Sequence, residues 1–251
     1  METTTNKDKL KRKKLNGNTT TEGSNTVKYK KKISRELAAY FKSYKNGLGD
    51  WHLLIFTAVI DEIFENEQTK KILYPGCYRH ITPSLVFSHV VYVDSDSKMN
   101  SFFADDQVRG WVEDNKQYPG DAHYDFICKN FTSPDLNESL EKESFDLLIS
   151  ACAGFAAPTT TEYLKKGGYC LISDAHYDAR LMSLDNTFTL KAVWINNKFV
   201  WDRIVLDQHF VTVKNEAVTQ AMVDESVSKP KARRSFKLKQ EAMFYLFIKN
   251  N

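Results

Sequence analysis

The stretch KILYPGCYRHITPSLVFSHVVYVDSD, residues 71–96, decides the fold of this chain. It opens with one apolar run, Lys71–Cys77, and closes with a second, Val90–Asp94, and neither run alternates between apolar and polar residues. Continuous apolar strands are typical of a parallel sheet that helices cover on both faces. We therefore expect two strands of such a sheet, with a short helix over Ile81–Ser88 between them.

The same alternation of strand and helix extends along the chain. Further apolar runs predict strands over Tyr124–Asn130, Phe145–Ala151 and Tyr169–Asp174. Helices are expected over 33–44, 51–64, 97–115 and 159–166, the last one ending at Gly167-Gly168. This order predicts an α/β fold with a Rossmann-like, doubly wound and mostly parallel sheet.

The pattern changes after residue 186. Two strand-like segments, Phe188–Ile195 and Lys198–Val205, flank Asn196-Asn197, which is typical of a tight hairpin turn. Residues 214–234 are polar and are expected to form a loop or linker. The last apolar segment, Glu241–Ile248, is expected to pack on the body as an edge strand or as a helix.

Ligands of open α/β sheets bind at the carboxyl ends of the strands. The loop after the first strand carries a single glycine, where a ligand can approach the backbone closely. A Gly-x-Gly-x-x-Gly fingerprint would place further glycines where Tyr78 and Ile81 stand, so a plain strand-to-helix turn is the alternative. The candidate contacts in this loop are Tyr74, Pro75, Gly76 and Cys77.

An acid ends the second strand. Asp94 follows Gly76 by 18 residues, and an acid about 20 residues after such a glycine turn can bind the ribose hydroxyls of a cofactor. Ser95 is included as a neighbour and Asp96 is the fallback. A solvated turn acid or a helix cap is the alternative interpretation.

The later strand ends supply the remaining candidates. Asn130 and Phe131 could meet an adenine ring, although Asn130 could equally be a turn residue. The small residues Ser150 and Ala151 would let a ligand lie against the backbone. Cys152 is a poor candidate nucleophile because it has no charged partner or histidine beside it in sequence.

The end of the fifth strand offers candidate catalytic groups. His176 is the one obvious general base near a predicted strand end, and Asp174 could serve in its place. A loop histidine without a role is the alternative for His176.

Charge divides the chain unevenly. Residues 1–32 carry ten Lys and Arg against three acids, so the net charge of +3 combines a tail of +7 with a body of −4. We expect residues 1–32 to be a disordered basic tail, 33–210 the Rossmann-like domain with its N-terminal helices, and 211–251 a polar linker with a C-terminal segment that packs on the domain. The tail could make weak contact with nucleic acid or an anionic surface.

The four cysteines form no Cys-x-x-Cys pair, so we expect neither a metal site nor a redox motif. Each lies in or beside an apolar run, as reduced cysteines do. No signal-peptide pattern and no transmembrane segment are recognisable. A cytoplasmic protein is therefore expected.

These residues in this order resemble the class I S-adenosylmethionine-dependent methyltransferases over roughly residues 50–205. The matching features are Pro75-Gly76-Cys77, Asp94, Ser150–Gly154 and the hairpin around Asn196-Asn197. The stretches LYPG, ITPSLVF, VVYVDSD, DLLISACAGF and AMFYLFIK look like a bacterial subgroup of methyltransferase-like proteins. The resemblance implies S-adenosylmethionine as cofactor.

The resemblance has departures that bear on the acceptor. The usual Gly-x-Gly run is missing, and Ala151-Cys152-Ala153-Gly154 stands where enzymes that methylate the amino groups of bases carry Asn/Asp-Pro-Pro-aromatic. This departure argues against adenine or cytosine amino-methylation. We expect methyl transfer to an unidentified small-molecule or protein acceptor, with catalysis resting mainly on positioning.

Three other functions compete with this one. A catalytically inactive binding module with the same fold is favoured by the degenerate glycine loop and disfavoured by the intact Asp94. An NAD-dependent oxidoreductase is disfavoured because a pyrophosphate needs the missing glycines, and by the terminal hairpin. Nucleic-acid binding would depend on the basic tail, because the body is acidic. The sequence names neither the acceptor nor an oligomeric state.

Overall fold

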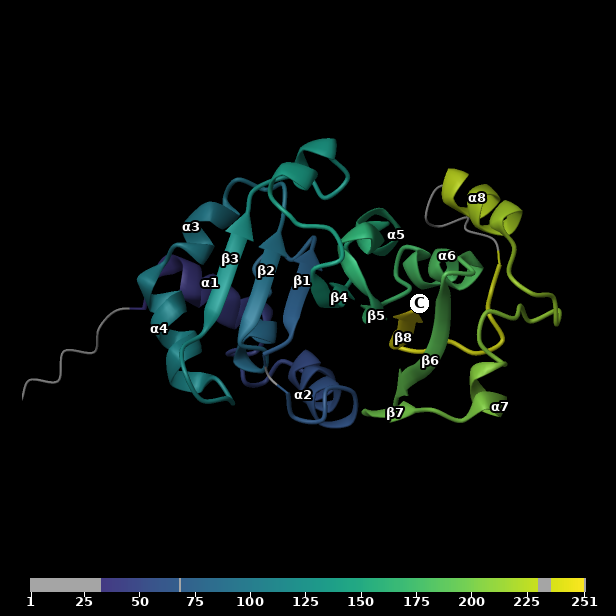
Figure 1. Cartoon of the computed structure of the whole chain (residues 1–251), viewed down its shortest axis with the longest axis horizontal. Helices are drawn as coiled ribbons and strands as arrows, with labels where there is room; N and C mark the ends of the chain where they lie inside the picture. Colours follow the sequence, from purple (N-terminus) through teal and green to yellow (C-terminus); the bar gives the residue numbers. More distant parts are fainter. Residues whose placement is uncertain (1–32, 68, 230–235, 251) are drawn as a thin grey trace, which may run out of the picture. The chain divides into compact units, whose positions relative to one another are not determined.

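The computed structural model describes residues 33–67, 69–229 and 236–250, and the predicted basic tail lies outside them. In these residues the strands form one sheet of eight. In chain order they are β1 (Lys71–Pro75), β2 (His89–Val93), β3 (His123–Ile127), β4 (Phe145–Ser150), β5 (Leu164–Ile172), β6 (Phe188–Ile195), β7 (Lys198–Val200) and β8 (Phe244–Lys249). Across the sheet the order is β3-β2-β1-β4-β5-β8-β6-β7 (Figure 1).

Strands β1 to β5 are paired in parallel, whereas β8 is antiparallel to both of its neighbours, β5 and β6. The predicted hairpin is present between β6 and β7. Its turn residues Asn196 and Asn197 have φ of 52° and 60°, the left-handed conformation that two-residue hairpin turns require. The prediction of a Rossmann-like, mostly parallel sheet with a terminal antiparallel hairpin is confirmed.

Helices cover both faces of the sheet. The α-helices are α1 (Arg35–Ser43), α2 (His52–Glu62), α3 (Met99–Phe103), α4 (Asp106–Asn115), α5 (Ala156–Thr160), α6 (Asp178–Leu184), α7 (Arg203–Leu206) and α8 (Gln220–Ser228), with 3₁₀ turns η1 (Thr82–Leu85), η2 (Pro134–Glu138) and η3 (Thr161–Tyr163). Ile72 and Tyr74 of β1 share a core with α1 to α4, and Leu73 between them shares another with α5 to α7. The strands are therefore buried on both faces, as their continuous apolar sequences predicted.

The expectation of an edge strand or helix at Glu241–Ile248 is wrong. The segment forms β8, an interior strand between β5 and β6. Phe244 and Leu246 face one core, and Tyr245 and Phe247 face the other. A run that is apolar at every position fits a strand that is covered on both sides and paired on both edges.

The predicted helix over Thr159–Lys166 is also wrong. Helix α5 ends at Thr160, and β5 begins at Leu164. The register of β5 against β4 shifts in its first half, where Gly167 has φ of 74°. Gly167-Gly168 therefore belongs to an irregularity within a strand, a common use of glycine, and does not end a helix.

Capping residues explain two more differences. The predicted helix over 97–115 is two helices, because Asp105 accepts hydrogen bonds from the amides of Gln107 and Val108 and starts α4. The strand predicted over Lys198–Val205 ends at Val200, since Asp202 caps α7 in the same way.

The expected loop over 214–234 contains α8, which Thr219 caps. The helix predicted over Ile81–Ser88 is only the 3₁₀ turn η1, with a proline in its first turn. Helix α6, directly after the fifth strand, was not predicted. None of the helices in the described ranges is long and apolar enough to cross a membrane.

The interior position of β8 predicts a large cost for cutting its side chains. Leu246 is fully buried, so Leu246→Ala should lower the free energy of unfolding by about 2–5 kcal/mol, measured by urea denaturation. The control Ile204→Ala removes a side chain that is 77% exposed and should change stability by less than about 0.5 kcal/mol. Equal effects of the two substitutions would contradict an interior β8.

Candidate functional site

The ends of β1 and β2 meet at the carboxyl edge of the sheet. The amide of Gly76 donates a hydrogen bond to the carbonyl of Val93 at 2.7 Å, and the amide of Tyr78 donates to Oδ2 of Asp94 at 2.8 Å. Oδ1 of Asp94 accepts from the amide of Asp96 at 2.9 Å. The structure thus brings together the glycine loop and the acid that the sequence singled out.

The space beside Gly76 is occupied by the chain itself. Gly76 has φ of 65°, and a Cβ built on it would lie 2.3 Å from Cβ of Ala153, in the loop after β4. Cε1 of Phe131 lies 3.5 Å from the same point. The close approach that the sequence predicted for a ligand is therefore made here by Ala153.

The other side chains of the glycine loop face the core. Tyr74 and Cys77 are each 2% exposed, and Pro75 is buried as well. The hydroxyl of Tyr74 is hydrogen-bonded to Nδ1 of His80 at 2.8 Å, and burial raises the pKa of the Cys77 thiol. A ligand at this loop would meet its backbone and not these side chains.

The predicted adenine contacts differ from each other. Asn130 is exposed, and its Oδ1 accepts from the amide and the hydroxyl of Thr132, both at 3.0 Å, so it stabilises its own turn. Phe131 is half-buried and reaches Gly76. Ser95 is exposed. Phe131 is thus the residue of this group that lies beside the glycine loop.

Ser150 is hydrogen-bonded to a buried carboxyl group. Its hydroxyl donates to Oδ2 of Asp178, which also accepts from the amide of Ala157 at 3.2 Å. Asp178 is 2% exposed, its Oδ1 has no hydrogen-bond partner among the described residues, and burial raises its pKa to about 7. Ser150 therefore binds the start of α6, while the neighbouring Ala151 packs against the core.

The two candidate bases lie in different surroundings. Asp174 forms an ion pair with Nε of Arg180 at 2.9 Å. Burial raises the pKa of Asp174 to about 6, against the opposing effect of Arg180. Arg180 also reaches Glu241 at 3.2 Å. His176 is half-buried in the loop between β5 and α6.

A pocket of about 340 Å³ opens beside these strand ends. Asp174 lines it and His176 does not. The pocket is lined by Trp51, His52, Cys152, Ser173, Asp174, Ala175, Arg180, Glu241, Ala242, Met243, Phe244 and Tyr245. It therefore combines an aromatic and apolar wall with a charged group of two acids and one arginine.

A buried network that the sequence analysis missed adjoins this pocket. Oδ1 of Asp50 is 2.7 Å from Nδ1 of His52, and its Oδ2 is 2.7 Å from both Nε2 of His80 and the hydroxyl of Thr82. Burial lowers the pKa of His80 to about 4, against the opposing effect of Asp50. Asp50 was not singled out from the sequence, and two histidines in apolar surroundings were the available signal.

Aspartate and histidine are common metal ligands, and the ligand atoms of Asp50, His52 and His80 lie within 4.8 Å of one another. Two ligands on a tetrahedral metal with bonds near 2.0–2.1 Å lie roughly 3.3 Å apart. The carboxylate–imidazole distances of 2.7 Å are those of charge-assisted hydrogen bonds. Asp50, His52 and His80 therefore form a hydrogen-bonded network here.

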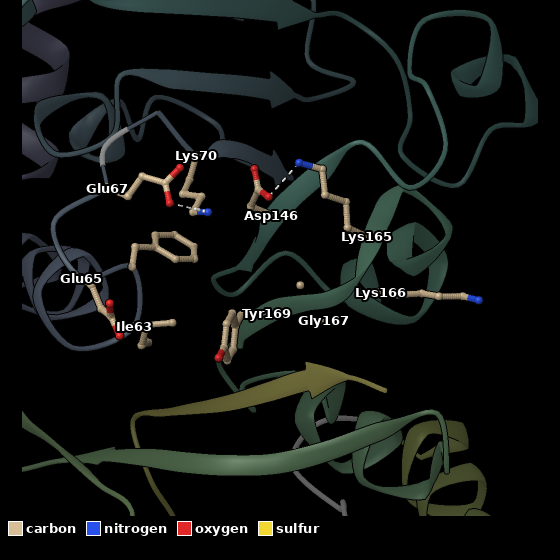
Figure 2. Close-up of a pocket in the computed structure, with 11 residues that line it drawn as sticks. Ile63, Glu65, Glu67, Lys70, Asp146, Lys165, Lys166, Gly167 and Tyr169 are labelled. Atoms are coloured by element: carbon tan, nitrogen blue, oxygen red, sulfur yellow. Dashed lines mark hydrogen bonds and ion pairs between the residues drawn. The ribbon is translucent and has the colours of Figure 1, made fainter. Parts of the chain in front are cut away.

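A second pocket, of about 250 Å³, lies at the amino-terminal ends of β1 and β4. Figure 2 shows Lys70 beside Glu67 and Lys165 beside Asp146, ion pairs of 2.7 and 2.8 Å. Lys166 points away from them (Figure 2). Because ligands of such sheets bind at the opposite edge, we place the candidate site at the carboxyl ends.

The residues at the carboxyl ends of the strands fit an adenosine-bearing cofactor in part. Asp94 is half-buried beside the glycine loop and keeps unused lone pairs, and Phe131 offers an aromatic surface. The position next to Gly76 is filled, so a cofactor there requires Ala153 to move. Ala153 lies between Cys152 and Gly154, whose φ values of 60° and 84° are both left-handed.

The contact between Gly76 and Ala153 predicts that substitutions at the two positions have coupled effects on stability. Gly76→Ala should lower the free energy of unfolding by about 1–3 kcal/mol because its Cβ overlaps that of Ala153. Adding Ala153→Gly should restore all but about 1 kcal/mol, the cost of a left-handed alanine. Urea denaturation of the single and double variants measures both effects.

Gly110→Ala is the matched control, because a Cβ at this helical position meets nothing within 4 Å. It should stabilise the protein by about 0.5–1 kcal/mol. Failure of Ala153→Gly to relieve the Gly76→Ala defect would show that another group fills the space.

The raised pKa of Asp178 predicts that the stability of the protein depends on pH. Its folded pKa of about 7 lies above the unfolded value of about 3.9, so its contribution to stability is lost as the pH rises from about 4 through 7. Asp178→Asn should match the wild type at pH 4 and be more stable by about 1–3 kcal/mol at pH 8. Urea denaturation at both pH values, with the exposed Asp114→Asn as control, checks it; no gain at pH 8 would contradict the prediction.

No family model and no curated protein matches this chain. Among solved structures, it is similar to the O-methyltransferase TomG from Streptomyces achromogenes in complex with S-adenosylmethionine (8% identity over 88% of this chain and 92% of that one, TM-score 0.46). It is also similar to an S-adenosylmethionine-dependent methyltransferase from Archaeoglobus fulgidus (12% identity over 84% of this chain and 99% of that one, TM-score 0.38). A third similar structure is an rRNA methylase from Streptococcus thermophilus (11% identity over 80% of this chain and 94% of that one, TM-score 0.40). With its parallel strands β1 to β5 and the antiparallel strand β8 inserted between β5 and β6, the chain has a Rossmann-like α/β fold.

Proposed function

We propose that this protein is an S-adenosylmethionine-dependent methyltransferase that acts on a small-molecule or protein acceptor. One observation carries the proposal: a single loop separates the glycine loop from the pocket. Within that loop Ala153 contacts Gly76, while its neighbour Cys152 lines the pocket. A donor at the glycine loop and an acceptor in the pocket would thus be adjacent, as a transfer that depends on positioning requires.

The roles of this chain's residues follow from their places. Asp94 would accept hydrogen bonds from the ribose hydroxyls, and Phe131 would pack against the adenine. The ion pair of Asp174 and Arg180, with Glu241, would orient a polar group of the acceptor in the pocket. The cofactor would supply an electrophilic methyl group.

A second candidate, a binding module without turnover, is favoured by one specific observation. Ala153 fills the position beside Gly76 that a cofactor would need. If this contact persists in solution, the fold keeps its shape without admitting a cofactor at the glycine loop. The same loop therefore discriminates between the two functions.

Calorimetric titration with S-adenosylmethionine, S-adenosylhomocysteine and NAD tests the proposal. We expect saturable binding of the two sulfur compounds and none of NAD. Asp94→Asn should weaken binding at least about 10-fold, because a hydrogen bond to a charged group is worth about 1.5–3 kcal/mol. Ala153→Gly should strengthen it by opening the position beside Gly76.

Asp96→Asn is the matched control, an acid two residues away that caps its own turn through the amide of Lys98. It should leave the affinity within about threefold. A folded protein that binds neither sulfur compound, even as Ala153→Gly, would overturn the cofactor assignment and leave the binding module.

A further inference from the structure

We infer that His52 is the general base of this protein and that the pocket accepts a small aromatic hydroxyl compound, whose proton His52 removes. The inference rests on the proposed function, which it extends by naming the base and the acceptor class. Asp50 acts through His52 and is a positioning residue.

The hydrogen bonds of Asp50 fix the tautomer of His52. The carboxylate accepts four: the backbone amide of His52 at 3.1 Å, Nδ1 of His52, Nε2 of His80 and the hydroxyl of Thr82. Burial raises the pKa of Asp50, but the hydrogen bonds from His52 and His80 outweigh it and hold that pKa well below its usual range. An ionised Asp50 only accepts, so Nδ1 of His52 carries the hydrogen and Nε2 keeps its lone pair.

Packing holds the ring of His52 in one place. It stacks on Trp51 with ring centroids 3.7 Å apart, and it meets Phe244 edge-on at 6.0 Å. His80 is enclosed, with a side chain 3% exposed, whereas the side chain of His52 is 16% exposed and lines the pocket. Of the two imidazoles bound to Asp50, His52 is the one that an acceptor can reach.

The buried charge of Asp50 favours proton transfer to His52. His80 is held neutral by burial, and among the described residues the Asp50 carboxylate forms no ion pair with a lysine or arginine. An imidazolium at His52 would form an ion pair with Asp50 at the 2.7 Å contact. This is how a buried carboxylate stabilises the protonated form of a catalytic histidine.

The walls of the pocket indicate the kind of acceptor. Trp51, Phe244 and Tyr245 supply aromatic surface, and Met243 adds a thioether, which packs well on rings. A volume of about 340 Å³ suits a molecule of one or two rings. A base is needed only for an acceptor that still carries its proton, and an aromatic hydroxyl joins a flat apolar body to such a group.

In the proposed step the acceptor loses a proton and gains a methyl group. The O–H bond of the acceptor breaks, its electron pair stays on the oxygen, and the proton moves to Nε2 of His52. The oxygen forms a bond to the methyl carbon as the carbon–sulfur bond breaks, with that electron pair remaining on sulfur. His52 then releases the proton to solvent through the pocket. The charged and titratable groups that neighbour His52 or share the pocket lining with it are Asp50, His80, Cys152, Asp174, Arg180, Glu241 and Tyr245.

Two phenols test the role of His52 in the full-length protein. At pH 7.5, 4-methoxyphenol carries its proton and 2,4-dinitrophenol is ionised. Loss of a general base should slow methyl transfer to 4-methoxyphenol by about 100-fold or more in His52→Gln. Transfer to 2,4-dinitrophenol should change by less than about threefold, relative to the wild type with the same acceptor.

Asp50→Asn should show the same acceptor-dependent loss, smaller in size. His123→Gln, an exposed histidine at the start of β3, is the matched control and should change neither rate. Calorimetry should give His52→Gln the affinity of the wild type for S-adenosylmethionine. Proton–nitrogen NMR should show Nδ1 of His52 protonated, and 4-methoxyphenol should shift the ring signals of His52 and not those of His123.

Each other result overturns the inference in a recognisable way. Equal losses with both phenols would make His52 a structural residue. A wild type that binds S-adenosylmethionine but methylates neither phenol would reject aromatic hydroxyl acceptors. Loss of activity with EDTA, restored by Zn²⁺, would identify a metal site in place of a base. Absence of S-adenosylmethionine binding would instead overturn the proposed function, on which this role of His52 depends.

Discussion

The insertion of β8 between β5 and β6 is the constraint on which the rest of the structure depends. Its side chains complete both cores, since Leu246 joins the core under α1 to α4 and Phe247 joins the core under α5 to α7. Because β8 is antiparallel, its first residues lie where the parallel strands end. Phe244 and Tyr245 thereby become walls of the pocket, beside Ser173 and Asp174 from the end of β5.

A buried carboxylate connects the N-terminal helices to this edge. Asp50 stands before α2, and its partners His80 and Thr82 lie in the segment between β1 and β2. Tyr74 of β1 and Tyr40 of α1 extend the network through further hydrogen bonds of 2.8 and 2.9 Å. The cost of burying a charge is offset only when its acceptors are satisfied, so the network fixes α2, and with it His52, against the pocket.

The left-handed conformation of Gly76 leaves a position beside the backbone that either a ligand or the chain itself can occupy. A left-handed Gly76 permits a close approach, and in this structure Ala153 makes that approach. A cofactor and Ala153, in the loop after β4, cannot both occupy the position beside Gly76. The loop after β4 lies between the glycine loop and the pocket, so its position distinguishes the proposed methyl transfer from binding alone.

The sequence by itself determined the parallel sheet, the hairpin at Asn196-Asn197 and the proximity of Asp94 to the glycine loop. These follow from local signals: continuous apolar runs, an Asn-Asn turn and the spacing of a glycine and an acid at the ends of two successive strands. The sequence could not place β8, because an entirely apolar segment is compatible with a strand or a buried helix. It missed the breaks at Asp105 and Asp202, because a cap acts only when the neighbouring amides lack other partners.

Only the tertiary structure decided the composition of the candidate site. Asp50 and His80 are 30 positions apart, and Cys152 and Glu241 are farther still from each other, so no sequence spacing joins them. The structure placed Asp174 in the pocket and His176 outside its lining, although both follow the same strand. Local preferences set the elements, whereas long-range pairing of β8 and the burial of Asp50 determined which side chains meet.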